Sequence, residues 1–288
     1  MLLGRLIETT EILGSFPDEP RERNLSVFET SEAVSLSAAG DVLLVGDLNI
    51  VEFGYVRRTD GSEPRRVSAD CAAASLSLDG RLFLCVENDG FAIAPTGPGE
   101  KRRLGRGGVS TEVTDLGRCK FFPDGKRIYF AGVAADGKDR IWVQDLDGGK
   151  PRGVTPDGVR RPVVVGEGRS LCARAADGAW YLYPVDETGE PRKVVGIQPG
   201  EEPIQSSPEG ILYVRGADEL RPGETLMTTR VYRLDPATGR RELWKEIPPR
   251  DPRTGGAIGT ILFSGDGRTC VWTHIRYSTE LVLAEGLK

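Results

Sequence analysis

A short turn built around glycine recurs six times along the chain and constrains the fold more than any other feature of the sequence. Its copies are SAAGD, SLDGR, FPDGK, VGEGR, SPEG and SGDGR, with the last glycines at Gly40, Gly80, Gly125, Gly168, Gly210 and Gly267. Successive glycines stand 40, 45, 43, 42 and 57 residues apart. Glycine readily takes the left-handed conformation that closes a hairpin, and proline and aspartate before it favour the same reversal. The chain is therefore predicted to turn back on itself at regular intervals.

A second turn follows each of the first five copies, at TDGSEPRRVS, PTGPGEKRRLG, LDGGKPRGVT, ETGEPRKVVG and ATGRRELW. The segments between turns are short and apolar on both faces. In RIYFAG, Ile128 and Phe130 alternate with Tyr129 and Ala131. Such a strand needs cover on both sides, which sheets stacked around an axis give one another. Four short strands in a unit of about 40 residues predict an all-β fold, a β-propeller of four-stranded antiparallel blades.

The number of blades depends on how the two ends of the chain are counted. Five complete units are predicted at about 31–70, 71–107, 108–157, 158–199 and 200–249, all within one domain, residues 1–288. Residues 1–30 form a partial unit without an innermost strand, and residues 250–288 form a partial unit of three strands. Pairing of the two ends would give six blades. Separate terminal sheets would give seven, the count we favour from the sequence.

Composition limits the classes of partner. The chain has 39% hydrophobic and 28% charged residues and a net charge of -5, so it has material for a core and no overall attraction to nucleic acid or anionic membranes. Charged residues interrupt the apolar N-terminus, and no run approaches the ~18 apolar residues of a membrane span. We therefore expect no nucleic acid partner, no membrane insertion, a monomer, and a cytoplasmic location for the sequence as written.

Five cysteines, an odd number, are scattered without CxxC spacing: Cys71, Cys85, Cys119, Cys172 and Cys270. Most lie inside apolar runs. This pattern predicts buried free thiols rather than a disulfide framework or a zinc site.

Segments such as FPDGKRIYFAG and IWVQDLDGGKPRGVT resemble the TolB-type, WD-repeat-like propeller units of bacteria. RTDGSEPRRV, YLYPVDETGEPRKV and VYRLDPATGRRELWKE are more specifically similar to the C-terminal propeller region of some bacterial serine/threonine protein kinases. That resemblance implies a kinase domain and membrane span upstream, and an extracytoplasmic propeller in such a longer protein. The chain has no HRD or DFG motif, so phosphoryl transfer is not carried over.

Three chemical motifs have a simpler structural interpretation. GVAADGKD, residues 132–139, approaches a phosphate loop, but Asp139 replaces the required Ser or Thr and the segment joins two strands, so we predict a hairpin. His274, the single histidine, is predicted to be packed or at the rim rather than catalytic. The carboxylate pairs Asp145/Asp147 and Glu201/Glu202 are predicted to cap turns or face solvent.

Paired basic residues recur after the second turn, at Arg65-Arg66, Arg102-Arg103, Arg192-Lys193 and Arg240-Arg241. Aromatic residues for stacking nucleic-acid bases are not interleaved with them. The outermost strand of each blade is an exposed edge, and charge there discourages sheet-to-sheet aggregation. We therefore assign these pairs to edge strands.

Loops that enter the inner strands and loops between the second and third strands share one face of such a propeller. They include Thr111–Arg118, Arg160-Arg161, Glu201-Glu202 and the insertion 216–229, which carries Asp218 and Glu219. A long polar loop is a common place for recognition, and plain tolerance of insertions is the competing interpretation.

From these observations we expect a non-catalytic module, binding or sensory, that takes a protein or small-molecule ligand on one face. We expect no cofactor, no metal and no catalytic residue, and the sequence names no binding residue. The alternative is a propeller hydrolase or lyase that uses carboxylates near the central axis. An enzyme should gather several ionisable side chains within hydrogen-bond reach in one pocket, whereas a scaffold should present a broad rim without such a cluster. Clustered carboxylates with strongly perturbed pKa values would contradict the non-catalytic module.

Overall fold

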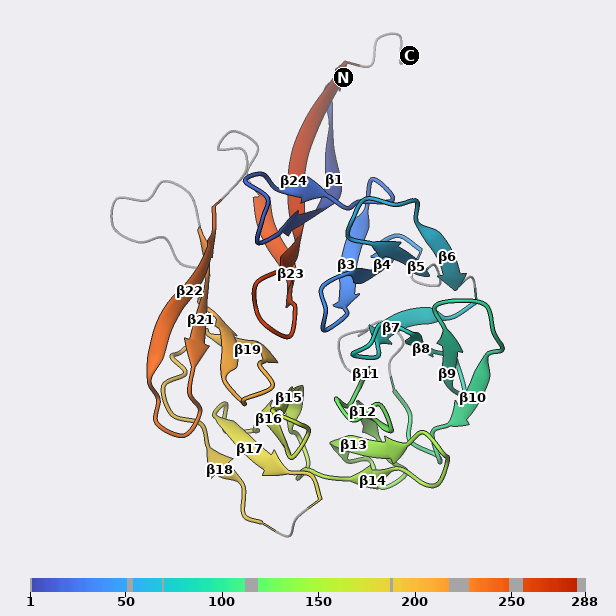
Figure 1. Cartoon of the computed structure of the whole chain (residues 1–288), viewed down its shortest axis with the longest axis vertical. Helices are drawn as coiled ribbons and strands as arrows, with labels where there is room; N and C mark the ends of the chain where they lie inside the picture. The colour runs from blue at the N-terminus through green and yellow to red at the C-terminus, as the bar shows by residue number, and fades with distance from the viewer. Residues whose placement is uncertain are drawn as a thin grey trace.

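The computed structural model is a β-propeller of six four-stranded antiparallel sheets arranged as a ring around a central axis (Figure 1). It describes residues 2–50, 54–68, 70–111, 119–186, 189–217, 228–248 and 256–283, and no helix occurs among them. The predicted all-β propeller of four-stranded blades is confirmed.

Five blades are each formed by one continuous segment of the chain, with the first strand innermost and the fourth at the outer edge. Blade B contains β3 (Ser31–Leu36), β4 (Val42–Asp47), β5 (Gly54–Arg58) and β6 (Arg65–Ser68). Blade C contains β7 (Ala72–Leu76), β8 (Leu82–Val86), β9 (Gly90–Pro95) and β10 (Arg102–Gly105). Blade D contains β11 (Cys119–Phe121), β12 (Arg127–Val133), β13 (Asp139–Asp145) and β14 (Arg152–Gly153). Blade E contains β15 (Arg160–Val165), β16 (Ser170–Arg174), β17 (Trp180–Pro184) and β18 (Arg192–Lys193). Blade F contains β19 (Glu202–Ser206), β20 (Leu212–Arg215), β21 (Thr229–Leu234) and β22 (Arg241–Ile247).

The sixth sheet, blade A, is shared between the two ends of the chain. β1 (Leu2–Ser15) and β2 (Arg23–Asn24) pair with β24 (Cys270–Leu283) and β23 (Gly256–Phe263) in the order β2-β1-β24-β23. The preferred count of seven sheets is therefore wrong. The partial units at 1–30 and 250–288 are not separate sheets, because β1 and β24 are long strands that run side by side from Leu2↔Leu283 to Ser15↔Cys270. No glycine or proline interrupts either strand near its middle.

The recurring glycine turn has the same geometry in every blade. All six glycines have positive φ, from 64° at Gly125 to 91° at Gly210. In each copy the glycine N–H donates to the carbonyl three residues earlier, as in Gly80 to Ser77 at 2.9 Å. This turn joins the innermost strand of each blade to the second strand.

Apolar side chains on both faces of the strands form the core between neighbouring blades. On β12, Ile128 and Phe130 pack with Leu84 and Phe91 of blade C. Tyr129, on the opposite face of the same strand, packs with residues of blade E that include Leu171. The two-faced strands predicted from RIYFAG therefore connect adjacent sheets rather than facing water.

The structure corrects one prediction about the cysteines. Cys71 and Cys85 form a disulfide with a Cα–Cα distance of 5.7 Å, whereas Cys119, Cys172 and Cys270 are buried free thiols as predicted. Cys71 directly precedes β7 and Cys85 lies in β8, so the first hairpin of blade C brings the two together. The odd cysteine count concealed this pair.

In the part of the chain that the structure describes, no helix is long and apolar enough to cross a membrane.

Candidate functional site

The innermost strands of the six blades line a central channel. Five of them, β3, β7, β15, β19 and β23, change register against their neighbour at about the same level, for example between Ala33 and Ser35 or between Pro203 and Gln205. A β-bulge redirects side chains and bends the strand locally. The bulges therefore mark the level at which the two cavities of the channel meet.

The first cavity, here called the apolar chamber, lies at the C-terminal ends of the inner strands and has a volume of about 520 Å³. Its apolar wall contains Leu36, Leu76, Phe121, Val164, Ile204, Leu262 and Phe263. Pockets of this size accommodate small organic ligands.

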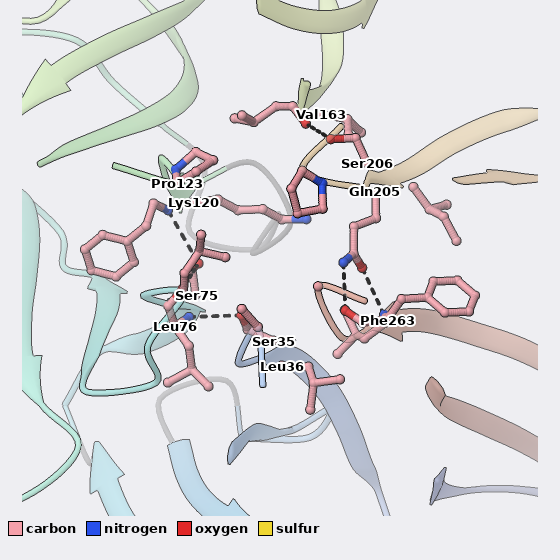
Figure 2. Close-up of a pocket in the computed structure, with 18 of the residues that line it drawn as sticks. Ser35, Leu36, Ser75, Leu76, Lys120, Pro123, Val163, Gln205, Ser206 and Phe263 are labelled. Atoms are coloured by element: carbon pink, nitrogen blue, oxygen red, sulfur yellow. Dashed lines mark hydrogen bonds between the residues drawn. The ribbon is translucent and has the colours of Figure 1, made fainter. Parts of the chain in front are cut away.

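Most polar side chains of the apolar chamber are already bonded to the backbone of a neighbouring blade (Figure 2). Ser35 Oγ accepts the N–H of Leu76 at 3.0 Å. Gln205 Oε1 accepts the N–H of Phe263 at 3.0 Å, and its Nε2 donates to the Phe263 carbonyl at 2.7 Å. Ser206 Oγ donates to the carbonyl of Val164 at 2.8 Å. These bonds connect adjacent blades and leave the chamber wall largely apolar.

Lys120 is different, because its side chain extends into the channel and lines both cavities (Figure 2). It is half-buried, and no hydrogen bond or ion pair joins its ammonium to another residue that the structure describes. Burial lowers the pKa of Lys120, and the carboxylate charge of Glu202 opposes this shift. Of the described residues that line the apolar chamber, Lys120 is the one lysine or arginine.

The second cavity, here called the polar chamber, lies at the N-terminal ends of the inner strands and has a volume of about 540 Å³. Its ionisable side chains are Glu32, Lys120, Arg160, Arg161, Glu202 and Arg215. It meets the apolar chamber at a waist formed by Val34, Lys120, Val163, Ile204 and Leu262, which line both cavities.

Glu32 is the carboxylate of the polar chamber with a perturbed pKa. Its side chain comes from β3, and its Oε1 accepts a hydrogen bond from Thr260 Oγ1 of β23 at 3.1 Å. Burial raises the pKa of Glu32, and the Thr260 hydrogen bond reduces this rise. A glutamate with a raised pKa is suited to take up and release a proton nearer to neutral pH.

The remaining charges of the chamber are held by specific partners. Arg161 forms an ion pair with Glu202, and Arg160 forms one with Asp139 at 3.0 Å. Arg161 has φ 57°, and it is the one residue other than glycine with positive φ in the described ranges. Strain of this kind in a side-chain-bearing residue tends to occur at functional sites. Arg215 Nη1 donates to the carbonyl of Gly259 at 3.1 Å, beside Thr260.

The structure separates the members of the predicted surface loops. Arg160, Arg161 and Glu202 line the polar chamber. Glu201 does not, because it is buried and binds Arg241 at 2.7 Å while also accepting the N–H of Gln198. Thr111 accepts a hydrogen bond from Arg106, whereas residues 112–118 and most of the insertion, with Asp218 and Glu219, lie outside the described residues.

The other predicted motifs have structural roles. Residues 132–139 span the hairpin between β12 and β13, as predicted, and His274 is buried in β24 at 3% exposure. Asp145 and Asp147 are exposed. The paired basic residues fall on or beside the outer strands β6, β10, β18 and β22, as predicted.

Sequence analysis did not find Glu32 or Lys120, although the repeat contains a signal for both. Five residues before each turn glycine stand Ser35, Ser75, Lys120, Val163, Gln205 and Leu262. Eight residues before it stand Glu32, Ala72, Gly117, Arg160, Glu202 and Gly259. Aligning the units on their glycines would have placed the ionisable members of both sets on the axis.

No protein-family model and no curated protein sequence matches this chain. Several solved structures are similar to it. A TolB-type protein from Agrobacterium tumefaciens superposes with a TM-score of 0.65 at 18% identity, covering 94% of this chain and 99% of the other. A gluconolactonase from Xanthomonas campestris gives 0.55 at 13% identity, covering 86% of each chain. The calcium-binding protein regucalcin from A. tumefaciens gives 0.52 at 12% identity, covering 82% of this chain and 78% of the other. These likenesses establish a TolB-like propeller fold.

The prediction of a non-catalytic binding or sensory module needs correction. The propellers that resemble this chain include an enzyme, the gluconolactonase. The polar chamber also gathers two carboxylates and several cations in one cavity, and the pKa values of Glu32 and Lys120 are both perturbed. Ionisable side chains gathered in one cavity favour the enzymatic alternative over the non-catalytic module. Among the described residues, four blades contribute them, B, D, E and F, so no single unit of the sequence contains the cluster.

The polar chamber does not fit calcium, the cation that regucalcin binds. Calcium takes six to eight oxygen ligands, many of them carboxylate oxygens. Among the residues that the structure describes, four of the six ionisable lining residues are basic, and the ammonium of Lys120 extends into the channel. Nowhere among the described residues do three or more His, Cys, Asp and Glu side chains gather as a metal site. We derive no catalytic step through a metal ion.

Proposed function

We propose that this protein is a propeller hydrolase or lyase whose reaction takes place in the axial channel, at the polar chamber. The observation that carries the proposal is that Glu32 and Lys120 line one cavity and that burial shifts both pKa values toward neutrality. Pairs of titratable groups with shifted pKa values in a cleft are candidates for acid and base roles. The likeness to a gluconolactonase supports a hydrolytic reaction.

In the hydrolytic form, the substrate is an ester or a lactone, and Glu32 is the general base. Its carboxylate removes a proton from a water molecule as the water oxygen attacks the carbonyl carbon. The carbonyl π electrons move to oxygen, and the cationic Lys120 stabilises the resulting oxyanion. When the tetrahedral intermediate collapses, the bond to the alkoxide breaks and the protonated Glu32 returns the proton to that leaving group. The carboxylic acid and alcohol are the products.

In the lyase form, the same chamber is used, and Lys120 acts as the base. The lowered pKa of Lys120 increases the fraction of neutral amine, which can remove a proton next to a carbonyl or carboxylate group. The C–H electron pair forms a carbon–carbon double bond as the bond to a β-hydroxyl or β-alkoxy group breaks, and the lysine ammonium returns its proton to that leaving oxygen. Arg215 and Arg161 would then provide positive charge at the chamber wall. The finer resemblance to the propeller region of bacterial kinases remains a prediction without support from the structural neighbours reported above.

The decisive variant is Glu32→Gln, which keeps the shape of the side chain and removes the base. With a panel of p-nitrophenyl esters, lactones and hydroxy acids, we expect turnover to fall by roughly 10²–10⁴-fold relative to the unchanged protein. Glu190→Gln, at an exposed glutamate, is the matched control and should leave turnover unchanged.

The pH profile provides a second readout. The base must be deprotonated, so activity of the unchanged protein should rise with pH through the raised pKa of Glu32. Glu32→Gln should lose this limb. Full activity of Glu32→Gln, or a wild-type protein that converts no member of the panel, would contradict the proposal.

A further inference from the structure

The apolar chamber combines an apolar wall with one cation at its inner end. Leu36, Leu76, Phe121 and Leu262 contribute to the wall, and Lys120 lies at the waist. The two carboxylates of the chamber lining, Asp124 and Glu167, are both exposed residues of the turns, and Asp124 already binds Arg127 at 2.7 Å. Neither forms a hydrogen bond or ion pair with Lys120.

On the side of the apolar chamber, no described polar group bonds the ammonium of Lys120, and on the other side the charge of Glu202 offsets only part of the effect of burial on the Lys120 pKa. Ser35 and Gln205 occupy the equivalent position in other blades, and their polar atoms bond the backbone of the next blade. At this position blade D instead presents an ammonium that bonds no residue the structure describes. A half-buried cation next to apolar surface is costly unless an anion is supplied.

We propose that the channel binds an amphipathic carboxylic acid, with its hydrocarbon part in the apolar chamber and its carboxylate against Lys120. The same geometry defines the substrate class, an ester or lactone of an apolar acid. The acyl chain would occupy the apolar chamber, the carbonyl carbon would lie at the waist, and the leaving alcohol would lie in the polar chamber. The assignment of this substrate class rests on the proposed function, whereas binding of the free acid does not depend on it.

Binding should therefore be measured without turnover, by calorimetric titration of the full chain with sodium decanoate and with decan-1-ol. We expect decanoate to bind with one molecule per chain and decanol to bind at least about tenfold more weakly, because the alcohol lacks the charge that pairs with Lys120. Lys120→Met should weaken decanoate binding by at least about tenfold and abolish the difference between the two probes. Lys193→Met, on the exposed outer strand of blade E, is the matched control and should bind like the unchanged protein.

A second variant tests the position of the hydrocarbon. Leu36→Trp adds bulk to the wall of the apolar chamber and should weaken both probes. Lys120→Met removes a buried charge, so its melting temperature should not fall, and lost binding will not reflect unfolding. Equal decanoate affinity in Lys120→Met and wild type, undiminished binding in Leu36→Trp, or no decanoate binding by the wild type would each overturn the proposal.

The two proposals fail in different ways. If decanoate binds as expected but no ester or lactone is converted, the ligand site stands and the hydrolytic function does not. If short-chain esters are converted but decanoate neither binds nor inhibits, the function stands and the apolar substrate class is wrong. Glu32→Gln should bind decanoate as the unchanged protein does, because Glu32 does not line the apolar chamber.

Discussion

Two side chains of the channel carry charges that burial opposes. The folded state lowers the pKa of Lys120 below its ordinary value of 10.5, so between these two pKa values the unfolded chain binds more protons and stability rises with pH. The contribution of Glu32 to stability changes with pH in the opposite direction. Its folded pKa lies above 4.5, so stability falls as pH rises through that window. At neutral pH the charged forms of both residues lower stability, which favours a functional reason for their presence.

The glycine turns make a prediction at single-residue resolution. Gly125 has φ +64°, and a Cβ added there would meet no other atom within 4 Å, so the backbone conformation alone opposes a side chain. We expect Gly125→Val to lower the free energy of unfolding by about 1–2 kcal/mol, because a β-branched residue resists the left-handed region. Urea denaturation measures this change.

Gly97 provides the matched control for Gly125. Its surroundings are equally open, but its φ lies outside the left-handed range. Gly97→Val should therefore change stability little. Equal effects of the two substitutions would show that the Gly125 turn does not depend on positive φ.

At the scale of strands and hairpins, blade C contains two local constraints, a register change in β7 and the Cys71–Cys85 disulfide. The disulfide connects residues separated by 14 positions, across the first hairpin of blade C. Closing a loop of this size restricts the unfolded chain.

We expect the double variant Cys71→Ala/Cys85→Ala to lose about 2–4 kcal/mol of stability. Thermal unfolding with and without reductant gives the measurement. Reductant should lower the melting temperature of the unchanged protein and leave that of the double variant as it is. A melting temperature of the unchanged protein that is insensitive to reductant would argue against the disulfide.

At the scale of the whole molecule, closure of the ring depends on β1 and β24. Their pairing extends from Leu2↔Leu283 to Ser15↔Cys270, and the inward side chains Ile12 and Val271 are fully buried in the core next to blade B. Because each blade is covered by its neighbours, an open ring would expose the faces of blades F and B.

We therefore expect deletion of residues 1–15 to abolish the cooperative unfolding transition seen by circular dichroism. A circular permutant that joins the two chain ends and opens the exposed turn between Asp60 and Gly61 is the control, because it retains all strands of blade A. It should unfold cooperatively. A deletion variant with the wild-type midpoint would show that β1 is dispensable for closure.

The repeat of turns and two-faced strands was sufficient to predict the propeller, because hairpin formation depends on neighbouring residues and a β-strand apolar on both faces has few ways to be covered. The number of blades was not predictable in this way. Whether β1 joins β24 or begins its own sheet depends on a contact between the two ends of the chain, about which local pattern carries no information.

For the channel too, some properties follow from the local sequence and others depend on the tertiary structure. Lys120 and Glu32 stand at fixed distances before their turn glycines, so their position on inner strands was contained in the sequence. Their shifted pKa values were not, because desolvation depends on the six inner strands that surround them. Local sequence thus determined the blades, and only the closed ring determined a cavity in which burial shifts the pKa values of Lys120 and Glu32.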